Sequence, residues 1–239
     1  MKKSILIFVF AMISSLLFGE QIIFSAASMS GSTSKSGVTK LKGNAYIRTD
    51  SMEILADQIE LSGEDYTDIK ASGNIAGKNF DSNMEFKCDS MKYNRDSKIA
   101  LLEGDVSLVD SQNDVNASAQ IIEYNQDTDI AVLQIEVKLT QKKNICTGTY
   151  AVYQKKQQLL ELSGNAQVKQ DKDTFRAQMI TLNLDTQEIS LTGNVKGSVT
   201  DTGKKEAAEK KEETENKEET ENKEDAGGSE IEPAVKEGE

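Results

Sequence analysis

The sequence contains no histidine and no tryptophan, and it has only one proline, Pro233, and two cysteines, Cys88 and Cys146. The absence of histidine excludes Ser-His and Cys-His catalysis and the usual zinc sites. Basic residues are also scarce, because 28 of them stand against 40 acidic residues in a chain of 239, for a net charge of −12. This balance argues against a nucleic-acid partner, since phosphate binding needs clustered lysine and arginine.

Groups that could carry catalysis or bind a metal are equally sparse. Paired carboxylates such as Asp127 with Asp129 are expected on the solvated turns of so acidic a chain. The segment 125–136 matches part of a calcium-loop pattern, but Ile130 stands where that loop needs glycine. We therefore predict no enzymatic activity, no metal site and no cofactor.

The N-terminus has the pattern of an export signal. Lys2 and Lys3 precede an apolar run from Ile5 to Phe18, and Ser25–Ala27 offers a cleavage site of small residues, so we assign residues 1–27 to a signal peptide. The run of 14 residues is shorter than the ~20 that span a bilayer. However, Ile22–Phe24 could extend it, and an uncleaved anchor is the alternative. The rest of the chain is exported in either case.

Composition divides the remainder of the chain. Residues 28–40 are rich in serine and glycine and predict a flexible linker. Residues 201–239 hold 15 acidic and 7 basic side chains with no apolar face, which predicts a disordered acidic tail. Cys88 and Cys146 either form a disulfide, as exported proteins allow, or remain as two free buried thiols.

A short phrase, Leu-x-Gly-Asn followed by an apolar residue, recurs along the region between linker and tail. Its third position occurs at intervals of 30, 31, 31, 29 and 29 residues, and the copies are centred on Gly43, Gly73, Gly104, Ile135, Gly164 and Gly193. A fixed period of this length is typical of stacked supersecondary units. The fourth copy departs from the pattern, because Ile135-Glu136 replaces Gly-Asn.

The segments between these copies predict strands with a corner. Apolar residues alternate at period two, as in Met84, Phe86 and Cys88, which indicates a half-buried strand. The alternation then slips by one position, so that Ile59 follows Ala56 as the next inward residue. Because the slip recurs in every repeat, we interpret it as a bulge or bend.

Each corner is followed by an Asn- and Asp-rich turn, such as 94–97, where the chain reverses. The next strand carries the repeated phrase, and parity predicts that Leu162, Gly164, Ala166 and Val168 all face inward, with the wall bending at the glycine. The inward set has few aromatics and many small residues, so it either fills a narrow space or leaves a groove. We predict two sheets over one apolar interior, with unpaired edges at the first and last repeats that invite pairing with another β-protein.

The combination of Leu-x-Gly-Asn-Val, the corner Ala56-Asp57-Gln58-Ile59 and the turn Tyr93-Asn94-Arg95-Asp96 resembles the OstA-like (LptA) family of periplasmic lipopolysaccharide-transport proteins. The resemblance covers about residues 41–200. It implies an all-β, open β-jelly roll of stacked V-shaped strands, in the periplasm of a diderm bacterium. It also implies a carrier that binds the acyl chains of lipopolysaccharide or a related glycolipid and passes them from the inner to the outer membrane.

By the same resemblance, the partners are OstA-like domains of inner- and outer-membrane proteins, joined through edge strands, or further copies of the chain in a head-to-tail oligomer. The residues that would form the acyl-binding wall are Ile54, Met84, Phe86, Met91, Tyr93, Val106, Leu108, Val115, Ile122, Tyr124, Phe175, Ile180 and Leu182. Two alternatives stay open. One is the membrane-anchored component of the same system, and the other is a structural surface β-solenoid with a closed, dry core and no ligand.

Overall fold

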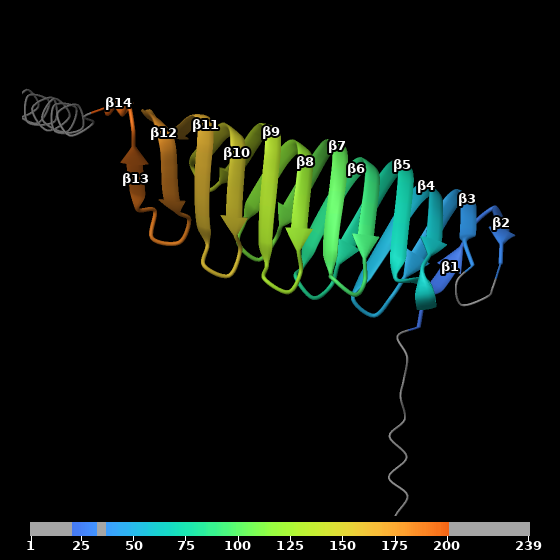
Figure 1. The fold of residues 1–239 in the computed structure, drawn as a ribbon. Coiled ribbons are helices and arrows are strands. Elements are labelled where there is room, and N and C mark those ends of the chain that lie inside the picture. The colour runs from blue at the N-terminus through green and yellow to red at the C-terminus, as the bar shows by residue number, and fades with distance from the viewer. Residues whose placement is uncertain (1–20, 33–36, 201–239) are drawn as a thin grey trace, which may run out of the picture. The chain divides into compact units, whose positions relative to one another are not determined.

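The computed structural model describes residues 21–32 and 37–200. Their strands form one 14-stranded antiparallel sheet in which nearly every strand pairs with the next along the chain (Figure 1). The strands are β1 (Ile23–Ser25), β2 (Ser28–Gly31), β3 (Thr39–Arg48), β4 (Met52–Ser62), β5 (Asp68–Asn79), β6 (Met84–Asn94), β7 (Ile99–Asp110), β8 (Val115–Asn125), β9 (Ile130–Gln141), β10 (Asn144–Gln154), β11 (Leu159–Gln170), β12 (Asp173–Asn183), β13 (Ile189–Thr192) and β14 (Lys196–Ser198). A 3-10 turn, η1 (Glu64–Tyr66), joins β4 to β5. Strands β1 to β13 lie in the first of two compact units, which ends at Gly197.

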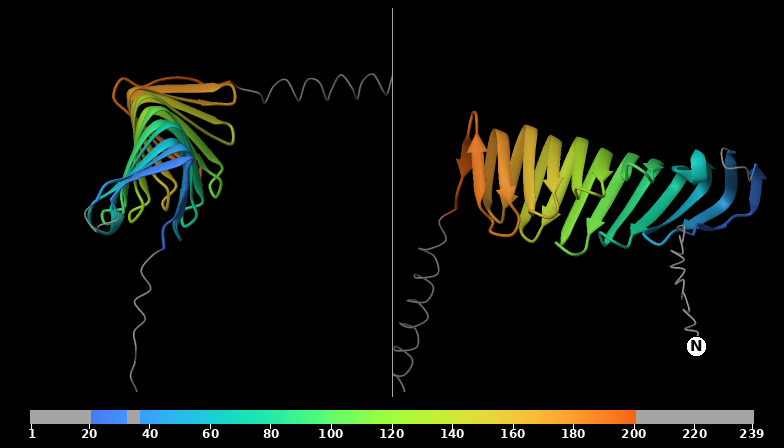
Figure 2. Two further views of the ribbon diagram at one scale, coloured as in Figure 1. Left: turned by 90° about the vertical axis from the view of Figure 1, so that its right-hand side faces the viewer. Right: turned by 60° about the horizontal axis from the view of Figure 1, so that its bottom comes forward.

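The sheet is folded lengthwise, and its end-on view is a V (Figure 2). Each long strand runs down one leg, through the vertex and into the other leg, so the hydrogen-bonded ladder continues across the fold. The predicted all-β architecture of stacked repeats is confirmed. The two predicted sheets are the two legs of one sheet, because a bulge bends each strand without ending it.

The vertex lies where the sequence predicts the corner. Between β5 and β6, Gly73 and Asn74 oppose the single residue Asp89, and both have positive φ, at 77° and 47°. A Cβ atom on Gly73 would lie 2.4 Å from the Asp57 carboxylate of β4. Glycine is therefore required here both by the backbone conformation and by the close approach of the neighbouring strand.

The prediction that Gly164 faces inward is wrong. Leu162, Ala166 and Val168 are buried as expected, whereas Gly164 is exposed. The bulge places two successive residues, Gly164 and Asn165, on the outer side of the vertex opposite Gln178, and the alternation resumes after them. A two-residue period cannot be carried through an extra residue.

The atypical fourth repeat keeps the same geometry. Ile135 and Glu136 take the left-handed conformation of the Gly-Asn pairs, with φ of 65° and 55°. The register of β9 with β10 shifts there as it does in the other repeats, and the ladder resumes at Val137. The groove wall is therefore continuous through this repeat. Ile135 holds a positive φ that a β-branched residue adopts only with strain.

The turns reverse the chain as predicted. Asn125 Oδ1 accepts hydrogen bonds from the backbone N–H groups of Asp127 at 3.0 Å and Thr128 at 3.1 Å. In a later turn, Asn183 Oδ1 accepts a hydrogen bond from the backbone N–H of Asp185. Because strands alternate in direction, the turns gather along the two free margins of the V. We define the first rim as turns 49–51, 80–83, 111–114, 142–143 and 171–172, the second rim as turns 63–67, 95–98, 126–129, 155–158 and 184–188, and the mouth as the space between the rims.

The N-terminal boundary differs from the prediction. The linker expected over 28–40 is wrong in part, because residues 28–31 form β2 and β3 begins at Thr39. The expected cleavage site also lies within the folded part, since β1 pairs with β3 and Ala27 N–H donates to Gly43 O at 2.9 Å. Backbone pairing to β3 outweighs the flexible composition of this segment. Residues 1–20 and the acidic tail lie outside the described residues.

Short strands cover both ends of the long-strand stack. β1 and β2 both pair with β3, and β13 and β14 both pair with β12. The edges are therefore strands of three or four residues, which is a common way to blunt a sheet edge. Within residues 21–32 and 37–200, no helix is long and apolar enough to cross a membrane.

The two cysteines are free and buried, in β6 and β10. Burial raises the pKa of the Cys88 thiol to about 11 and that of Cys146 to about 12. Both thiols therefore stay protonated at neutral pH and behave as small apolar side chains.

Candidate functional site

The interior of the V is one continuous apolar cluster that runs from β3 to β12. Of the thirteen residues predicted to line it, eleven are at most 6% exposed: Ile54, Met84, Met91, Tyr93, Val106, Leu108, Val115, Ile122, Tyr124, Ile180 and Leu182. Their parity in the sequence placed them on the inner face, and the legs of the V bring them together.

The two phenylalanines of the predicted wall are only partly buried. Phe86 packs against the cluster, and its ring lies over Gly77 of the adjacent strand, which has no side chain to oppose it. Phe175 lies near the C-terminal end of the sheet, where only the short β14 covers the beginning of β12, and its ring lies beside Gly197. Phe86 is thus the partly buried member of the wall in the middle of a complete repeat.

Polar residues from the two rims face each other across the mouth at the spacing of the repeat. On the first rim, Asn79, Asp110 and Gln141 end every second strand, β5, β7 and β9, at intervals of 31 residues. On the second rim, Gln126 and Lys155 begin successive turns at an interval of 29 residues. The same two positions oppose each other across the mouth: Asn79 and Gln126 both line a cavity, whereas Asp110 and Lys155 are in contact.

In the third repeat the mouth is closed by four residues that we name the clasp: Asp110, Asn113, Tyr153 and Lys155. Lys155 Nζ lies 2.6 Å from Asp110 Oδ1, and these side chains are 6% and 0% exposed. The Tyr153 hydroxyl and the Asn113 amide donate to Asp110 Oδ2 at 2.8 and 2.9 Å. β7 and β10 are not neighbours in the sheet, so these contacts cross the interior from rim to rim.

The clasp is held as an ion pair. Burial by itself raises the pKa of the Asp110 carboxyl, but the hydrogen bonds from Lys155, Tyr153 and Asn113 outweigh burial and hold the pKa below its ordinary value. Burial and the Asp110 carboxylate raise the pKa of Tyr153 well above its ordinary value, so its hydroxyl keeps the proton that it donates. A buried charge with this many partners is a stable closure.

The next repeat is closed by neutral groups. Gln141 Nε2 donates to Leu184 O at 3.0 Å, and Asn144 Nδ2 donates to Gln187 Oε1 at 2.6 Å. Gln187 Nε2 also reaches back to Gln141 Oε1 at 3.3 Å. Together with the clasp, these bonds form the closed section of the mouth.

Nearer the N-terminus the mouth holds a cavity of about 310 Å³. Both rims line it, with Thr49, Ser51, Met52, Asn79, Asp81 and Ser82 on one side and Tyr93, Arg95, Lys98, Gln126, Asp127 and Asp129 on the other. Met52 and Tyr93 also belong to the apolar cluster, so the cavity floor is the interior itself. We name this part the open section.

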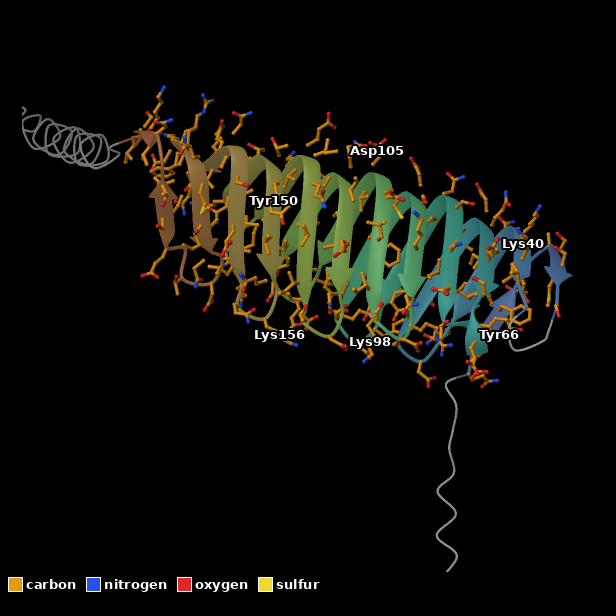
Figure 3. The ribbon with its side chains drawn as sticks, viewed as in Figure 1. Lys40, Tyr66, Lys98, Asp105, Tyr150 and Lys156 are labelled. Carbon is orange, nitrogen blue, oxygen red and sulfur yellow. The ribbon has the colours of Figure 1, made fainter. Side chains whose placement is uncertain are left out.

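Backbone bonds between successive turns hold the second rim along both sections. Arg95 N–H donates to Thr67 O at 2.8 Å, Gln126 N–H to Lys98 O at 3.0 Å, and Lys155 N–H to Asp129 O at 3.0 Å. The vertex lies on the opposite side of the sheet, so that Asp105 is far from Lys98 and Lys156 in Figure 3. The rim therefore presents its side chains at fixed intervals.

Apart from Tyr93, the residues of the mouth were missed from the sequence. One signal was present: the polar residues Asn79, Asp110 and Gln141 stand at inward positions at the ends of β5, β7 and β9, in register with the repeat. Aligning the repeats at their strand ends would have identified them. Their partners on the other rim are about 45 residues away and follow no short motif. Among the described residues, no group of three acidic or cysteine side chains is placed to hold a metal ion.

Comparisons with known proteins bear on this architecture. No curated protein matches the chain. Among solved structures, it is similar to LptH from Pseudomonas aeruginosa, described as the LptA-homologous periplasmic component of the conserved lipopolysaccharide transport device, with 10% identity, a TM-score of 0.25, and coverage of 76% of this chain and 96% of that chain. The family model described as LptA/(LptD N-terminal domain) LPS transport protein matches residues 26–158 and 147–188. The chain therefore belongs to the LptA/LptD N-terminal domain family of lipopolysaccharide transport proteins.

Proposed function

We propose that this chain is a periplasmic carrier that holds the acyl chains of lipopolysaccharide, or a related glycolipid, in the interior of the V and passes them from the inner to the outer membrane. The observation that carries the proposal is the apolar cluster, which runs from β3 to β12 beneath a mouth that extends along the stack. Burial of an acyl chain stabilises a complex by about 0.8 kcal/mol per CH₂ group.

The partners of this carrier are OstA-like domains that add strands to the two edges, or further copies of the chain joined head to tail. Apolar side chains support this part of the proposal, because Ile23 and Phe24 of β1 are 52% and 45% exposed, and Met179 of β12 is 48% exposed. Short edge strands can be displaced or extended by a longer strand of a partner. Light scattering of the purified chain over a range of concentrations tests the head-to-tail oligomer.

Photo-crosslinking in cells tests the carrier. A photo-reactive phenylalanine at Phe86 replaces a half-buried ring of the wall with little change of shape. Tyr150, which is 42% exposed on the outer face, is the matched aromatic control. The carrier predicts a lipopolysaccharide adduct from position 86 and none from position 150.

The same experiment separates the carrier from a structural protein with a permanently closed core. Both have buried walls, but only the carrier places lipid against them. Equal behaviour of positions 86 and 150, with no lipid adduct from either, would remove the basis of the proposal. N-terminal sequencing of the exported protein then decides whether the carrier is cleaved or membrane-anchored.

A charge in the wall gives a second test. Phe86→Asp places a carboxylate beside the acyl chains, where desolvation costs several kcal/mol, so lipid capture should be lost. Ile145→Asp, at a position of β10 that is 41% exposed, is the control and should capture lipid normally. Circular dichroism establishes that both variants fold. Normal capture by a folded Phe86→Asp variant would contradict the inward assignment.

A further inference from the structure

The cavity of the open section differs from the apolar interior beneath it in the chemistry of its walls. It is lined by hydroxyl, amide, carboxylate and guanidinium groups that converge from both rims, including Thr49, Ser51, Gln126, Asp127 and Arg95. Its volume of about 310 Å³ is at the lower end of the 300–1,000 Å³ that small-ligand sites occupy. The space therefore suits a small polar group.

The charges around the cavity are compensated locally. Lys98 Nζ lies 3.0 Å from Asp127 Oδ1, and Lys156 Nζ lies 3.2 Å from Asp129 Oδ2. The remaining charged residues of the lining, Arg95 and Asp81, are of opposite sign. The site therefore has no excess of positive charge for a phosphate and no excess of negative charge for a cation.

A neutral group with many hydroxyls matches this lining. Each sugar hydroxyl both donates and accepts, so it can bond to carboxylates, which only accept, to the guanidinium, which only donates, and to amides and hydroxyls. We propose that the open section is the binding site for the sugar head of the glycolipid cargo. This inference rests on the proposed function, and it adds the recognition of the head to the burial of the chains.

The clasp sets the limit of this site. Asn79 and Gln126 line the cavity, and the equivalent residues of the next repeat are Asp110 and Lys155. There the ion pair between Lys155 and Asp110 takes the place of the cavity. The sugar head would therefore sit over the N-terminal half of the stack, with its acyl chains extending beneath the closed section.

Two lipids with the same acyl chains test the proposal: glucosyl diacylglycerol, which carries a neutral sugar, and phosphatidic acid, which carries a phosphate. The exported chain is purified and the affinity for each lipid is measured by displacement of a fluorescent fatty acid. The wild type should bind the glucosyl lipid at least tenfold more tightly. The test variant is Asp81→Trp, which fills the cavity from an exposed turn.

The matched control is Gln112→Trp, because Gln112 is the exposed residue at the same turn position of the next repeat, outside the cavity. Asp81→Trp should lower the affinity for the glucosyl lipid at least tenfold and leave that for phosphatidic acid within twofold. Gln112→Trp should change neither. Asp127→Trp, from the opposite rim, repeats the loss if the cavity is the site.

The outcomes separate the two proposals. If the wild type binds both lipids and Asp81→Trp binds the glucosyl lipid unchanged, the sugar site is wrong and the carrier stands. If Asp81→Trp weakens both lipids equally, or phosphatidic acid binds more tightly than the glucosyl lipid, the sugar site is also wrong. If the wild type binds neither lipid, the proposed function itself fails.

Discussion

The open and closed sections of the mouth are built from the same repeat and differ in a few side chains. At the open section the facing residues are Asn79, Ser82, Tyr124 and Gln126, and one repeat later they are Asp110, Asn113, Tyr153 and Lys155. The tyrosine is common to both. In the open section the Tyr124 hydroxyl bonds to Asp129 of its own rim, whereas the Tyr153 hydroxyl crosses the mouth to Asp110.

This difference shows which positions of the repeat carry which property. The inward positions in the middle of each strand stay apolar in both sections, because they fill the interior. The residues at the strand ends contact the interior only at its margin, and they vary between repeats. In the clasp, closure depends on a complete set of donors around the buried carboxylate, since a buried charge without partners is strongly destabilising. In the next repeat, closure depends on neutral hydrogen bonds from Gln141 and Asn144.

Breaking the clasp should have the largest effect. Lys155→Met leaves the Asp110 carboxylate buried without its cation and should lower the free energy of unfolding by about 3–5 kcal/mol. The matched change in the open section, Gln126→Met, removes one acceptor of the Tyr93 hydroxyl and should cost about 1 kcal/mol. Urea denaturation followed by circular dichroism measures both. Equal losses would mean that the two sections are energetically alike.

Acid should weaken the closed section selectively. The pKa of Asp110 is lowered below its ordinary value of 3.8, so its contribution to stability is present above that value and is lost as pH falls through the lower, folded pKa. Between pH 5 and pH 2 the wild type should therefore lose more stability than Asp110→Asn, which has no carboxyl to protonate. Chemical denaturation at each pH measures this. Parallel curves for the two proteins would show that Asp110 is not held ionised.

Grafting the clasp into the open section should remove the difference between the two sections. Replacing Asn79 by Asp, Ser82 by Asn and Gln126 by Lys gives the open section the four residues of the clasp, since Tyr124 already matches Tyr153. The grafted mouth should close, and affinity for glucosyl diacylglycerol should fall at least fivefold. The single change Ser82→Asn is the control, because it adds no ion pair. Unchanged affinity in a folded graft would show that side chains at these positions do not decide closure.

Unlike the mouth, the vertex has the same geometry in both sections, with positive φ at the bulge of each repeat. Ile135 holds a positive φ where the other repeats have glycine, and it is 49% exposed. Ile135→Gly should stabilise the fold by about 0.5–1 kcal/mol, since relief of the left-handed strain exceeds the added entropy of the unfolded chain. The reverse change, Gly164→Ile, should destabilise it. Thermal unfolding measures both, and a loss of stability in Ile135→Gly would contradict the strain.

Much of the fold could be predicted from the sequence because its physical causes are local. The slip between Ala56 and Ile59 located the vertex, and alternation placed Ile54, Met84 and Ile122 on the inner face. The prediction failed where alternation or composition along the chain does not determine the structure. Gly164 was assigned inward by counting through the bulge, and residues 28–31 were assigned to a linker although backbone pairing alone holds them on β3.

The sequence by itself determined the repeat, the strands, the bend and the apolar lining, because each depends on residues close together in the chain. Only the tertiary structure decided which part of the mouth is open. Asp110 and Lys155 are 45 residues apart, at the ends of strands separated by two others in the sheet, and they meet only because the V folds one rim against the other with an offset. Contacts that skip neighbouring strands leave no periodicity in the sequence.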